Sequence, residues 1–440
     1  MSSASAAPSP APAHWDLVVI GGGPAGSTAA ALLAAAGKKV LVLEREAFPR
    51  FHIGESLLPY GNDVLKELGL WEKLHAGGFM PKYGAEFTLG NAAGIQRFLF
   101  RRNLAPEYGQ TFQVERAKFD HLLLQNAEEK GAVVLQQSKV TSLATTESGA
   151  TVTYEREGAS ATVTASWLLD ASGRTALLGN ALKLPKDDLG MRKKIAVFSH
   201  FKGVYRNEGE AAGHITIVRL EDAWCWFIPL DAEKTSVGLV QYLDAFKAAG
   251  RTPEESFHHA VSAHTELRFR LKDAARLRDF HTEGEYTFRF DRAAGPRWLL
   301  AGDAAGFIDP IFSSGVMVAL RSSQLAAKAI LKADADAVPR GLTGGEQRRY
   351  TREVKKMTTT FLNMIRMFYD RSSFEVFMAP RAPAGLLRAV LHLVAGDTNL
   401  SWPIRWRVRA FYALCRLQRH RAIAPRLTLL DGRAAEKEGA

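Results

Sequence analysis

The chain has 440 residues, of which 47% are hydrophobic and 23% are charged, a balance that excludes a largely disordered or collagen-like protein. At about 150 residues per domain, this length predicts two or three domains or one large enzyme with an inserted lobe. The formal net charge is +11, which favours an acidic partner or ligand.

The start of the chain and its few cysteines bear on where the protein resides. Residues 1–12 are rich in Ser, Ala and Pro and lack the basic and apolar segments of a signal peptide, so we expect a disordered tail over residues 1–13. Cys225 and Cys415 are too few for a disulfide framework or a cysteine-based zinc site. No apolar run reaches the roughly 18 residues of a membrane span. We therefore expect a soluble, cytoplasmic protein.

Residues 16–44 predict a strand, a glycine turn, a helix and a second strand. The turn carries Gly21, Gly23 and Gly26 at the spacing Gly-x-Gly-x-x-Gly, and the second strand ends on Glu44. Glycines at these positions allow a helix N-terminus to approach a pyrophosphate, and the acid accepts hydrogen bonds from a ribose. The pattern predicts a dinucleotide site and does not distinguish NAD from FAD.

The middle of the chain changes from alternating helices and strands to a β-rich region. After a helix over 119–130 and a strand over 132–136, alternating segments at 140–143, 151–154 and 162–169 predict a small antiparallel meander. Further β-like runs then cover 195–201, 214–220, 224–229, 236–242 and 285–290.

The β-rich runs are interrupted by one helix, which starts at a capping box formed by Thr252 and Glu255. A buried strand returns at 298–303, Gly315 begins a helix, and the chain from 347 onward is helical in pattern. The predicted domains are 14–190 together with 291–335, a separate antiparallel β-sheet lobe over 191–290, and a helical C-terminal region over 336–440.

Two distant strands end in an acid close to a glycine, at 167–174 and 299–304. These strand ends are where an α/β sheet presents its ligands. Their order resembles the glutathione-reductase-like flavoproteins, in the branch of p-hydroxybenzoate hydroxylase. The resemblance implies an FAD-binding domain of this class, in which Asp303 binds the ribitol chain, Arg116 lies beside the flavin and the backbone at Val140 contacts the adenine.

Three separated motifs narrow the resemblance to the flavin-dependent halogenases: Phe-Pro-Arg-Phe-His-Ile-Gly-Glu-Ser-Leu-Leu-Pro at 48–59, Trp-Cys-Trp-Phe-Ile-Pro at 224–229, and Phe-Ile-Asp-Pro-Ile-Phe-Ser-Ser-Gly at 307–315. The second implies a wall that keeps the oxidant from being spent on direct hydroxylation, formed by Trp224, Trp226, Ile228 and Pro229. The third implies a chloride or bromide site at Ser314 and Gly315. The implied FAD contacts are Gly21, Gly23, Ala25, Gly26, Glu44, Arg45, Ser56, Arg116, Val140, Asp303 and Gly315.

The resemblance also implies a mechanism centred on Lys82, which stands shortly before Gly84 where the family places its catalytic amine. A partner flavin reductase supplies reduced FAD, O2 adds to give a flavin hydroperoxide, and the halide attacks it. Lys82 then relays the hypohalous acid to an electron-rich aromatic ring. A flavin monooxygenase, a prenyl-type reductase on the same fold and a catalytically silent flavin-binding subunit are the alternatives.

The chain departs from the tryptophan-acting members in two places. Phe312 stands where those members have a glutamate, and Met317 stands where many members have a histidine. Because the missing carboxylate would act as a base near an indole, a phenol or pyrrole is the favoured substrate. His258, His259 and His264 lack the spacing of a metal site, so no metal is assigned, and no nucleic-acid-binding motif is present.

Residues 401–430 concentrate positive charge. They contain seven arginines and no acid, interleaved with Trp406, Phe411, Tyr412 and Leu414. Three interpretations are open: a helix packed on the domain, a docking face for an acidic carrier protein that holds the aromatic substrate, and an interfacial membrane helix. The apolar residues of the preceding segment are expected in the core, with a hydrophobic substrate lid as the alternative: Met357, Phe361, Met364, Phe368, Phe374 and Phe377.

Overall fold

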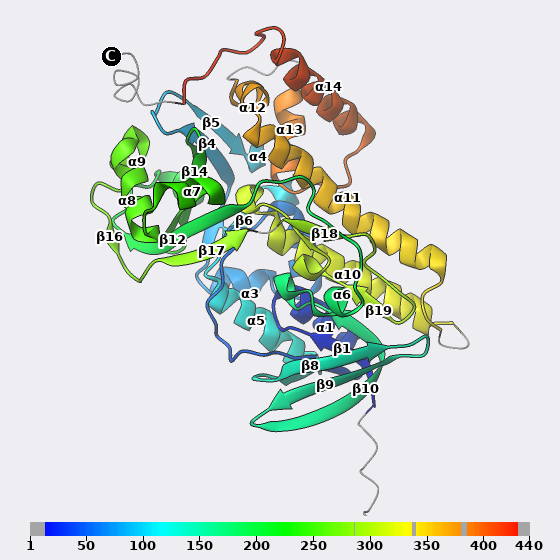
Figure 1. Cartoon of the computed structure of the whole chain (residues 1–440). Helices are drawn as coiled ribbons and strands as arrows, with labels where there is room; N and C mark the ends of the chain where they lie inside the picture. Colours follow the sequence, from blue (N-terminus) through cyan, green and yellow to red (C-terminus); the bar gives the residue numbers. More distant parts are fainter. Residues whose placement is uncertain (1–13, 286, 337–339, 380–384, 430–440) are drawn as a thin grey trace, which may run out of the picture.

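The computed structural model describes residues 14–285, 287–336, 340–379 and 385–429. The tail expected over 1–13 therefore lies outside the described residues. Figure 1 shows three regions: a sheet with helices at the bottom of the view, a β-rich lobe with short helices on the left, and a helical region at the top. None of the described helices combines the length and the apolar character that a membrane span requires.

The main sheet has seven strands in the order β7-β2-β1-β10-β9-β8, with β19 beside β10. The strands are β1 (His14–Ile20), β2 (Val40–Leu43), β7 (Val133–Leu135), β8 (Lys139–Thr145), β9 (Ala150–Arg156), β10 (Ala159–Asp170) and β19 (Trp298–Leu300). The expected strand, glycine turn, helix and strand are confirmed, since α1 (Pro24–Ala35) connects β1 to the parallel β2.

The long strand β10 joins the expected meander to the parallel sheet. Its first half pairs antiparallel with β9, and its second half pairs parallel with β1 and β19. Burial changes along the strand in the same way, from exposed residues to the fully buried residues 167–170. The carboxyl ends of β1, β2, β10 and β19 consequently meet at one edge of the sheet, where ligands of such sheets bind.

Helix α1 contacts both α5 (Arg116–Glu129) and α10 (Ser314–Asp334). The start of α10, expected at Gly315, is confirmed to within one residue. Smaller elements complete this part of the chain: α2 (Asn62–Glu67), α3 (Trp71–Ala76), α4 (Phe100–Asn103), α6 (Leu177–Ala181), and the paired strands β3 (Met80–Lys82) and β6 (Thr111–Gln113).

The lobe is built on an eight-stranded sheet in the order β16-β12-β15-β14-β13-β4-β5, with β17 beside β12. Its strands are β4 (Gly84–Leu89), β5 (Ile95–Leu99), β12 (Lys194–Lys202), β13 (Ile215–Arg219), β14 (Ala223–Pro229), β15 (Thr235–Tyr242), β16 (Ala275–Arg276) and β17 (His281–Glu285). The helices α7 (Leu243–Ala249), α8 (Pro253–Ala263) and α9 (Thr265–Arg270) belong to the lobe, and the expected capping box at Thr252 and Glu255 is confirmed.

Two details of the lobe differ from the sequence expectation. The strands β4 and β5, which the sequence pattern places with the FAD-binding region, extend the lobe sheet, and β4 pairs parallel with β13, so the sheet is mixed. The strand β18 (Phe288–Phe290) leaves the lobe and pairs with β11 (Lys186–Asp187) and β20 (Gly306–Phe307). Alternation of polar and apolar residues predicts a strand and does not identify its partner.

The C-terminal region is helical, as expected, with α11 (Gly344–Tyr369), α12 (Arg371–Met378), α13 (Leu386–Val394) and α14 (Trp402–Gln418). The expected core residues Met357, Phe361, Met364, Phe368, Phe374 and Phe377 are all buried. Phe368 and Phe377 contact the rings of Phe87 on β4 and Phe312 before α10. The helices therefore pack on both the lobe sheet and the segment that leads into α10.

Candidate functional site

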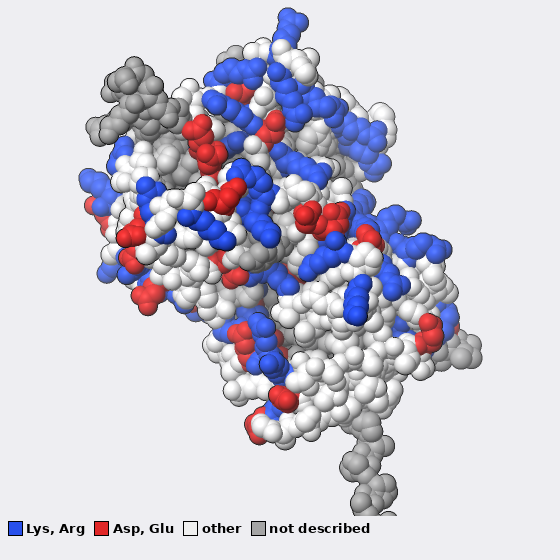
Figure 2. Space-filling model, viewed as in Figure 1, with Lys and Arg blue, Asp and Glu red and all other residues white. Residues whose placement is uncertain are grey.

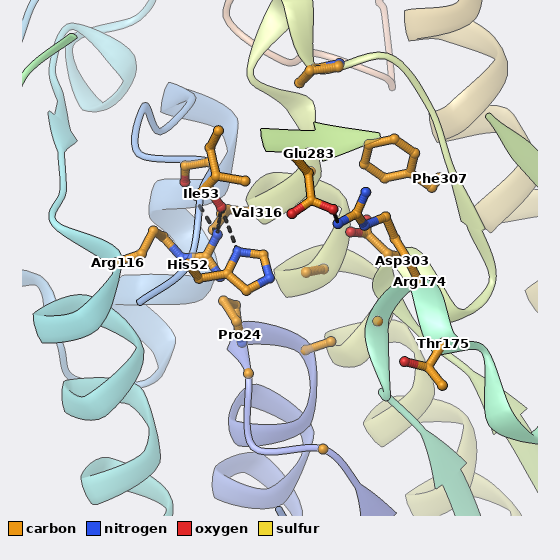
Figure 3. Close-up of a pocket in the computed structure, with 18 of the residues that line it drawn as sticks. Pro24, His52, Ile53, Arg116, Arg174, Thr175, Glu283, Asp303, Phe307 and Val316 are labelled. Carbon is orange, nitrogen blue, oxygen red and sulfur yellow. Dashed lines mark hydrogen bonds and ion pairs between the residues drawn. The ribbon is translucent and has the colours of Figure 1, made fainter. Parts of the chain in front are cut away.

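A cavity of about 350 Å³ lies between the main sheet and the lobe. Its wall is formed by the glycine turn before α1, the end of β2, the 50–56 loop, the loops after β10 and β19, the lobe strands β13, β14 and β17, and the start of α10. Figure 3 shows side chains from these segments facing a common space.

Most residues singled out in the sequence line this cavity. They are Gly21, Gly23, Ala25, Glu44, Arg45, Ser56, Arg116, Val140, Trp224, Trp226, Ile228, Asp303 and Gly315. Four others, Gly26, Lys82, Pro229 and Ser314, are buried and are not part of its wall. Among the described residues, no three His, Cys, Asp or Glu side chains are placed to hold a metal ion.

The three glycines of the turn have different functions in the fold. A β-carbon on Gly26 would lie 1.8 Å from the carbonyl oxygen of Gly21, and one on Gly21 would lie 2.5 Å from that of Ala171. A β-carbon on Gly23 meets only the end of the Arg50 side chain at 3.4 Å. Gly21 and Gly26 thus allow the chain to pack, whereas Gly23 keeps the N-terminal end of α1 open toward the cavity.

The carboxylate of Glu44 is held at the cavity wall by two backbone amides. Its Oε2 accepts a hydrogen bond from Gly22 N at 2.6 Å, and its Oε1 accepts one from Glu46 N at 2.8 Å. Each carboxylate oxygen has a further lone pair available for a ligand hydroxyl. Together with Val140, which also lines the cavity, this arrangement fits the ribose and adenine of a dinucleotide.

Asp303 follows β19 and faces the cavity in Figure 3. Within the described residues its carboxylate has no hydrogen-bond partner. Burial raises the pKa of Asp303, and the nearby Arg174 and Arg116 oppose that shift. A half-buried carboxylate without a partner in a cavity wall is costly, and the hydroxyl groups of a polyol chain would satisfy it. The site therefore fits the ribitol portion of FAD.

Arg116 is fixed at the first residue of α5. Its Nε and Nη2 donate to Asp120 at 2.6 and 2.8 Å, and its Nη1 donates to the carbonyl oxygen of Ile53 at 2.6 Å. The same Asp120 accepts from Arg50 Nη1 at 3.1 Å. This network attaches the 50–56 loop to α5 and places a cation in the cavity wall (Figure 3).

Arg174 connects the two regions that enclose the cavity, a role that its sequence context does not indicate. It forms an ion pair with Glu283 on β17 and donates from Nη1 to Gly284 O at 2.8 Å. Figure 3 shows this pair beside Asp303 and Phe307. The lobe is thereby held against the loop after β10 at the edge of the cavity.

A buried network joins the lobe to the segment before α10 through Tyr369, the last residue of α11. The Trp224 Nε1 donates to the Tyr369 hydroxyl at 2.8 Å, and that hydroxyl donates to Asp309 Oδ2 at 2.7 Å. Lys194 Nζ lies 2.9 Å from the same oxygen. Asp309 Oδ1 also accepts from Ile311 N at 2.9 Å, which fixes the turn that leads to Ser313 and α10.

Lys82, the last residue of β3, is 1% exposed. Its Nζ donates to Ser56 Oγ at 2.8 Å and to Leu57 O at 2.7 Å, and it lies 5.7 Å from the centre of the Phe100 ring. Within the described residues no carboxylate forms an ion pair with it. Burial lowers the pKa of Lys82 to about 7. Because Ser56 lines the cavity, one side chain lies between this amine and the cavity.

The lowered pKa of Lys82 predicts a pH dependence of stability. Between pH 7 and pH 10 the amine of Lys82 is protonated in the unfolded chain and largely unprotonated in the folded chain. The free energy of unfolding of the wild type should therefore rise with pH relative to that of Lys82→Met, by at most about 1.4 kcal/mol per pH unit. Denaturant unfolding of both proteins at several pH values measures the difference. A difference that does not change with pH would show that Lys82 keeps its ordinary pKa.

The chain matches one family model and is similar to characterised enzymes. A family model described as an FAD binding domain matches residues 14–359. A 1H-pyrrole-2-carbonyl-(peptidyl-carrier protein) chlorinase from Pseudomonas fluorescens is 36% identical over 342 residues, covering 72% of this chain and 76% of the relative. A tryptophan 2-halogenase from Chondromyces crocatus is 36% identical over 325 residues, covering 72% of this chain and 61% of the relative.

A solved structure adds a likeness over most of the chain. The crystal structure of a flavoprotein/dehydrogenase from Cytophaga hutchinsonii is 29% identical to this chain and has a TM-score of 0.83. The alignment covers 92% of this chain and 99% of that protein.

Proposed function

Because the chain belongs to the flavin-dependent halogenase family, we propose that it installs chlorine or bromine on an electron-rich aromatic ring of the pyrrole or phenol type. It would use reduced FAD supplied by a partner flavin reductase, together with O2 and a halide ion. The substrate would be either a free small molecule or an acyl group tethered to a carrier protein, as in the name of the chlorinase relative.

The contact between Lys82 and Ser56 carries this proposal. Ser56 lines the cavity that fits FAD, and its hydroxyl accepts a hydrogen bond from the Lys82 amine at 2.8 Å. A buried amine with a lowered pKa therefore lies directly behind the wall of a cofactor cavity. Such a perturbed group next to a cleft is a candidate for chemistry rather than for a solvated surface charge.

The cofactor would be held by residues of the main sheet. Gly23 and the N-terminal end of α1 would face the pyrophosphate, Glu44 the ribose and Asp303 the ribitol, with Arg116 beside the flavin. When bound and reduced, FAD supplies the electrons with which O2 is activated to oxidise a halide ion. The residues of this chain then decide where the halide sits and where the oxidised halogen goes.

The start of α10 is the candidate position for the halide. Gly315 lines the cavity, and a β-carbon on it would have no atom within 4 Å, so the backbone is accessible from the cavity. Ser314, which precedes Gly315, is buried and lies outside the cavity wall, so Gly315 is the better placed of the two residues for this role. Backbone N–H groups at the beginning of a 21-residue helix favour an anion.

Lys82 would receive the oxidised halogen and present it to the substrate. Near neutral pH its Nζ would be available as an ammonium, which donates to the oxygen of hypohalous acid, or as a free amine. The free amine would form an N–halogen bond as the oxygen–halogen bond breaks, and the hydroxyl would leave as water with one amine proton. Ser56 Oγ and Leu57 O fix the position of Nζ. Trp224, Trp226 and Ile228 form the apolar wall of the cavity, which limits direct attack of the oxidant on an organic substrate.

An aromatic cluster favours a substrate without a requirement for an adjacent base. Phe312 is buried, and its ring lies 6.0, 6.2 and 6.5 Å from those of Phe87, Phe368 and Phe377. Phe312 therefore offers no carboxylate that could act as a base near the substrate. A pyrrole or phenol ring is electron-rich enough to be halogenated without such a base. Since one relative is a tryptophan 2-halogenase, tryptophan is the necessary comparison substrate.

Product analysis tests the proposal. The protein is incubated with FAD, a flavin reductase, NADH and bromide, and with a reactive phenol, a 1H-pyrrole-2-carbonyl thioester or tryptophan. Mass spectrometry should find bromine in the phenol or pyrrole product. Incorporation of oxygen instead would identify a monooxygenase, loss of a double bond would identify a reductase, and failure to consume reduced FAD would identify a silent flavin-binding subunit.

The hydrogen-bond network at Tyr369 gives a further prediction. Tyr369→Phe removes the hydroxyl that joins Trp224 to Asp309. Trp224 in the cavity wall and Asp309 in the turn before α10 then each lose one hydrogen bond that holds them in place. We expect a severalfold increase in hydrogen peroxide released per halogenated product, with FAD affinity unchanged. Coupled assays of peroxide and product measure the ratio. An unchanged ratio would show that the network serves stability alone.

A further inference from the structure

Helix α14 has one buried and one exposed face. Ile404, Val408, Phe411, Cys415 and Gln418 are buried, and α14 contacts α12 and α13. The first interpretation of the arginine-rich segment, a helix packed on the domain, is therefore correct for this face. The remaining arginines are not explained by that packing.

The exposed face carries a stripe of cations and aromatic rings, here called the basic stripe, formed by Trp402, Arg405, Trp406, Arg409 and Arg416. Trp402 is 73% exposed and Trp406 is 40% exposed. Spacings of three, four and seven residues place these side chains on one side of the helix. Within the described residues none of the three arginines forms an ion pair, whereas Arg419 pairs with Asp370 at 3.3 Å. Figure 2 shows the blue side chains gathered over α14.

No acidic residue is near the basic stripe in the sequence, and the neighbouring Asp370 and Glu375 pair with Arg419 and Arg426 instead. Residues 398–429 contain no Asp or Glu. An uncompensated field of this kind attracts an anionic partner and raises its association rate. The solvent-exposed Arg388 on the adjoining helix α13 extends the positive charge beyond α14.

Helix α14 is linked to the surroundings of Lys82 through the neighbouring helices. Helix α14 contacts α13, and α13 contacts α4, whose Phe100 ring faces Lys82 Nζ. The loop that follows α13 is bonded to the segment that holds this amine, since Tyr60 N donates to Ala395 O at 3.1 Å. In Figure 1, α14 adjoins α12 and α13 at the end of the molecule opposite α1 and β10.

We propose that the basic stripe docks an acidic carrier protein that delivers the aromatic acyl group to Lys82; this inference rests on the proposed halogenase function. The stripe spreads cations along the whole helix, which suits an anionic protein surface. An interfacial membrane helix would need its apolar face turned outward, but in α14 that face is packed against α12 and α13. Trp402 and Trp406 provide the exposed aromatic surface that protein interfaces favour.

Charge reversal on the stripe tests the proposal. The triple variant Arg405→Glu, Arg409→Glu, Arg416→Glu is compared with the wild type by measuring kcat/KM. Two forms of one substrate are used: a 1H-pyrrole-2-carbonyl group loaded on a peptidyl carrier protein, and the same acyl group on a small thiol. We expect kcat/KM for the carrier-bound form to fall at least about tenfold at low salt, and the small thioester to be unaffected. The wild-type advantage should shrink as salt rises.

A matched control and a binding measurement separate the possible outcomes. The variant Lys202→Glu, Lys247→Glu, Lys328→Glu changes the net charge equally at exposed lysines away from α14 and should behave as wild type. Fluorescence anisotropy with the labelled carrier protein measures docking without any turnover and should show weaker binding only for the stripe variant.

The proposal is overturned if both triple variants lose carrier binding equally, if the stripe variant loses activity equally on both substrate forms, or if wild-type binding is independent of salt. Wild-type binding to phosphatidylglycerol vesicles that the stripe variant loses, with carrier binding unchanged, would identify a membrane surface instead. Halogenation of neither substrate with intact carrier binding would reject the proposed function and leave the docking face supported.

Discussion

A Gly23→Val variant is expected to fold like the wild type and to bind FAD at least about a hundredfold more weakly, a loss of about 2.7 kcal/mol. In the structure a β-carbon at this position has only Arg50 Nη2 nearby, at 3.4 Å, so a side chain is tolerated by the protein itself. It would project from the beginning of α1 into the space that the pyrophosphate needs.

Titration of the purified variant with FAD, followed by flavin fluorescence, measures the affinity. Gly94→Val is the matched control, because a β-carbon on Gly94 meets no atom within 4 Å and Gly94 lies outside the cavity wall. Both variants should unfold within a few degrees of wild type. A Gly23→Val protein that retains wild-type affinity would show that the cofactor does not approach the chain at this turn.

Lys82→Met is expected to reduce halogenated product at least about a hundredfold, the range typical of a positioned catalytic group, while FAD binding and oxidation of reduced FAD stay intact. The methionine side chain has a volume similar to that of lysine and fills the buried space without an amine. The hydroxyl of Ser56 and the carbonyl of Leu57 then lose their donor, but neither belongs to the turn that faces the pyrophosphate.

Parallel assays of product, FAD affinity and oxygen consumption separate the two roles that Lys82 can have. Ser56→Ala is the comparison, since it removes one acceptor of the Lys82 hydrogen bonds and keeps the amine, so we expect a smaller loss of product than in Lys82→Met. If Lys82→Met retains more than about a tenth of the wild-type halogenation, the relay role is rejected. Loss of FAD binding would make Lys82 a structural residue.

The two acids of the cavity wall were predictable because each stands at the carboxyl end of a strand. Glu44 ends β2, and Asp303 follows β19, so the parallel arrangement alone brings them to one edge. The ion pair between Arg174 and Glu283 could not be predicted in this way, because the two residues are more than 100 positions apart in the sequence. Arg174 ends the motif at 167–174, but that pattern does not identify its partner, and Glu283 has no local pattern that differs from an ordinary surface charge.

In the segment after residue 344, the sequence pattern predicted the helices but not the contacts of Tyr369. Its helical periodicity and buried aromatic residues were predictable, because amphipathic spacing reports which side of a helix is covered. The hydroxyl of Tyr369 at the end of α11 bonds with Trp224 and Asp309, which lie 145 and 60 residues earlier in the chain. A tyrosine in such a pattern is equally compatible with an ordinary core position.

By itself the sequence determined the dinucleotide turn, the halogenase family motifs and the helical character of the C-terminal region, because these depend on residue type and spacing within short segments. The tertiary structure alone decided which strands pair in the lobe, how deeply Lys82 is buried behind Ser56, and which arginines of α14 face solvent. Those features arise from packing between distant segments, where burial and the available partners set the position and the pKa of each side chain.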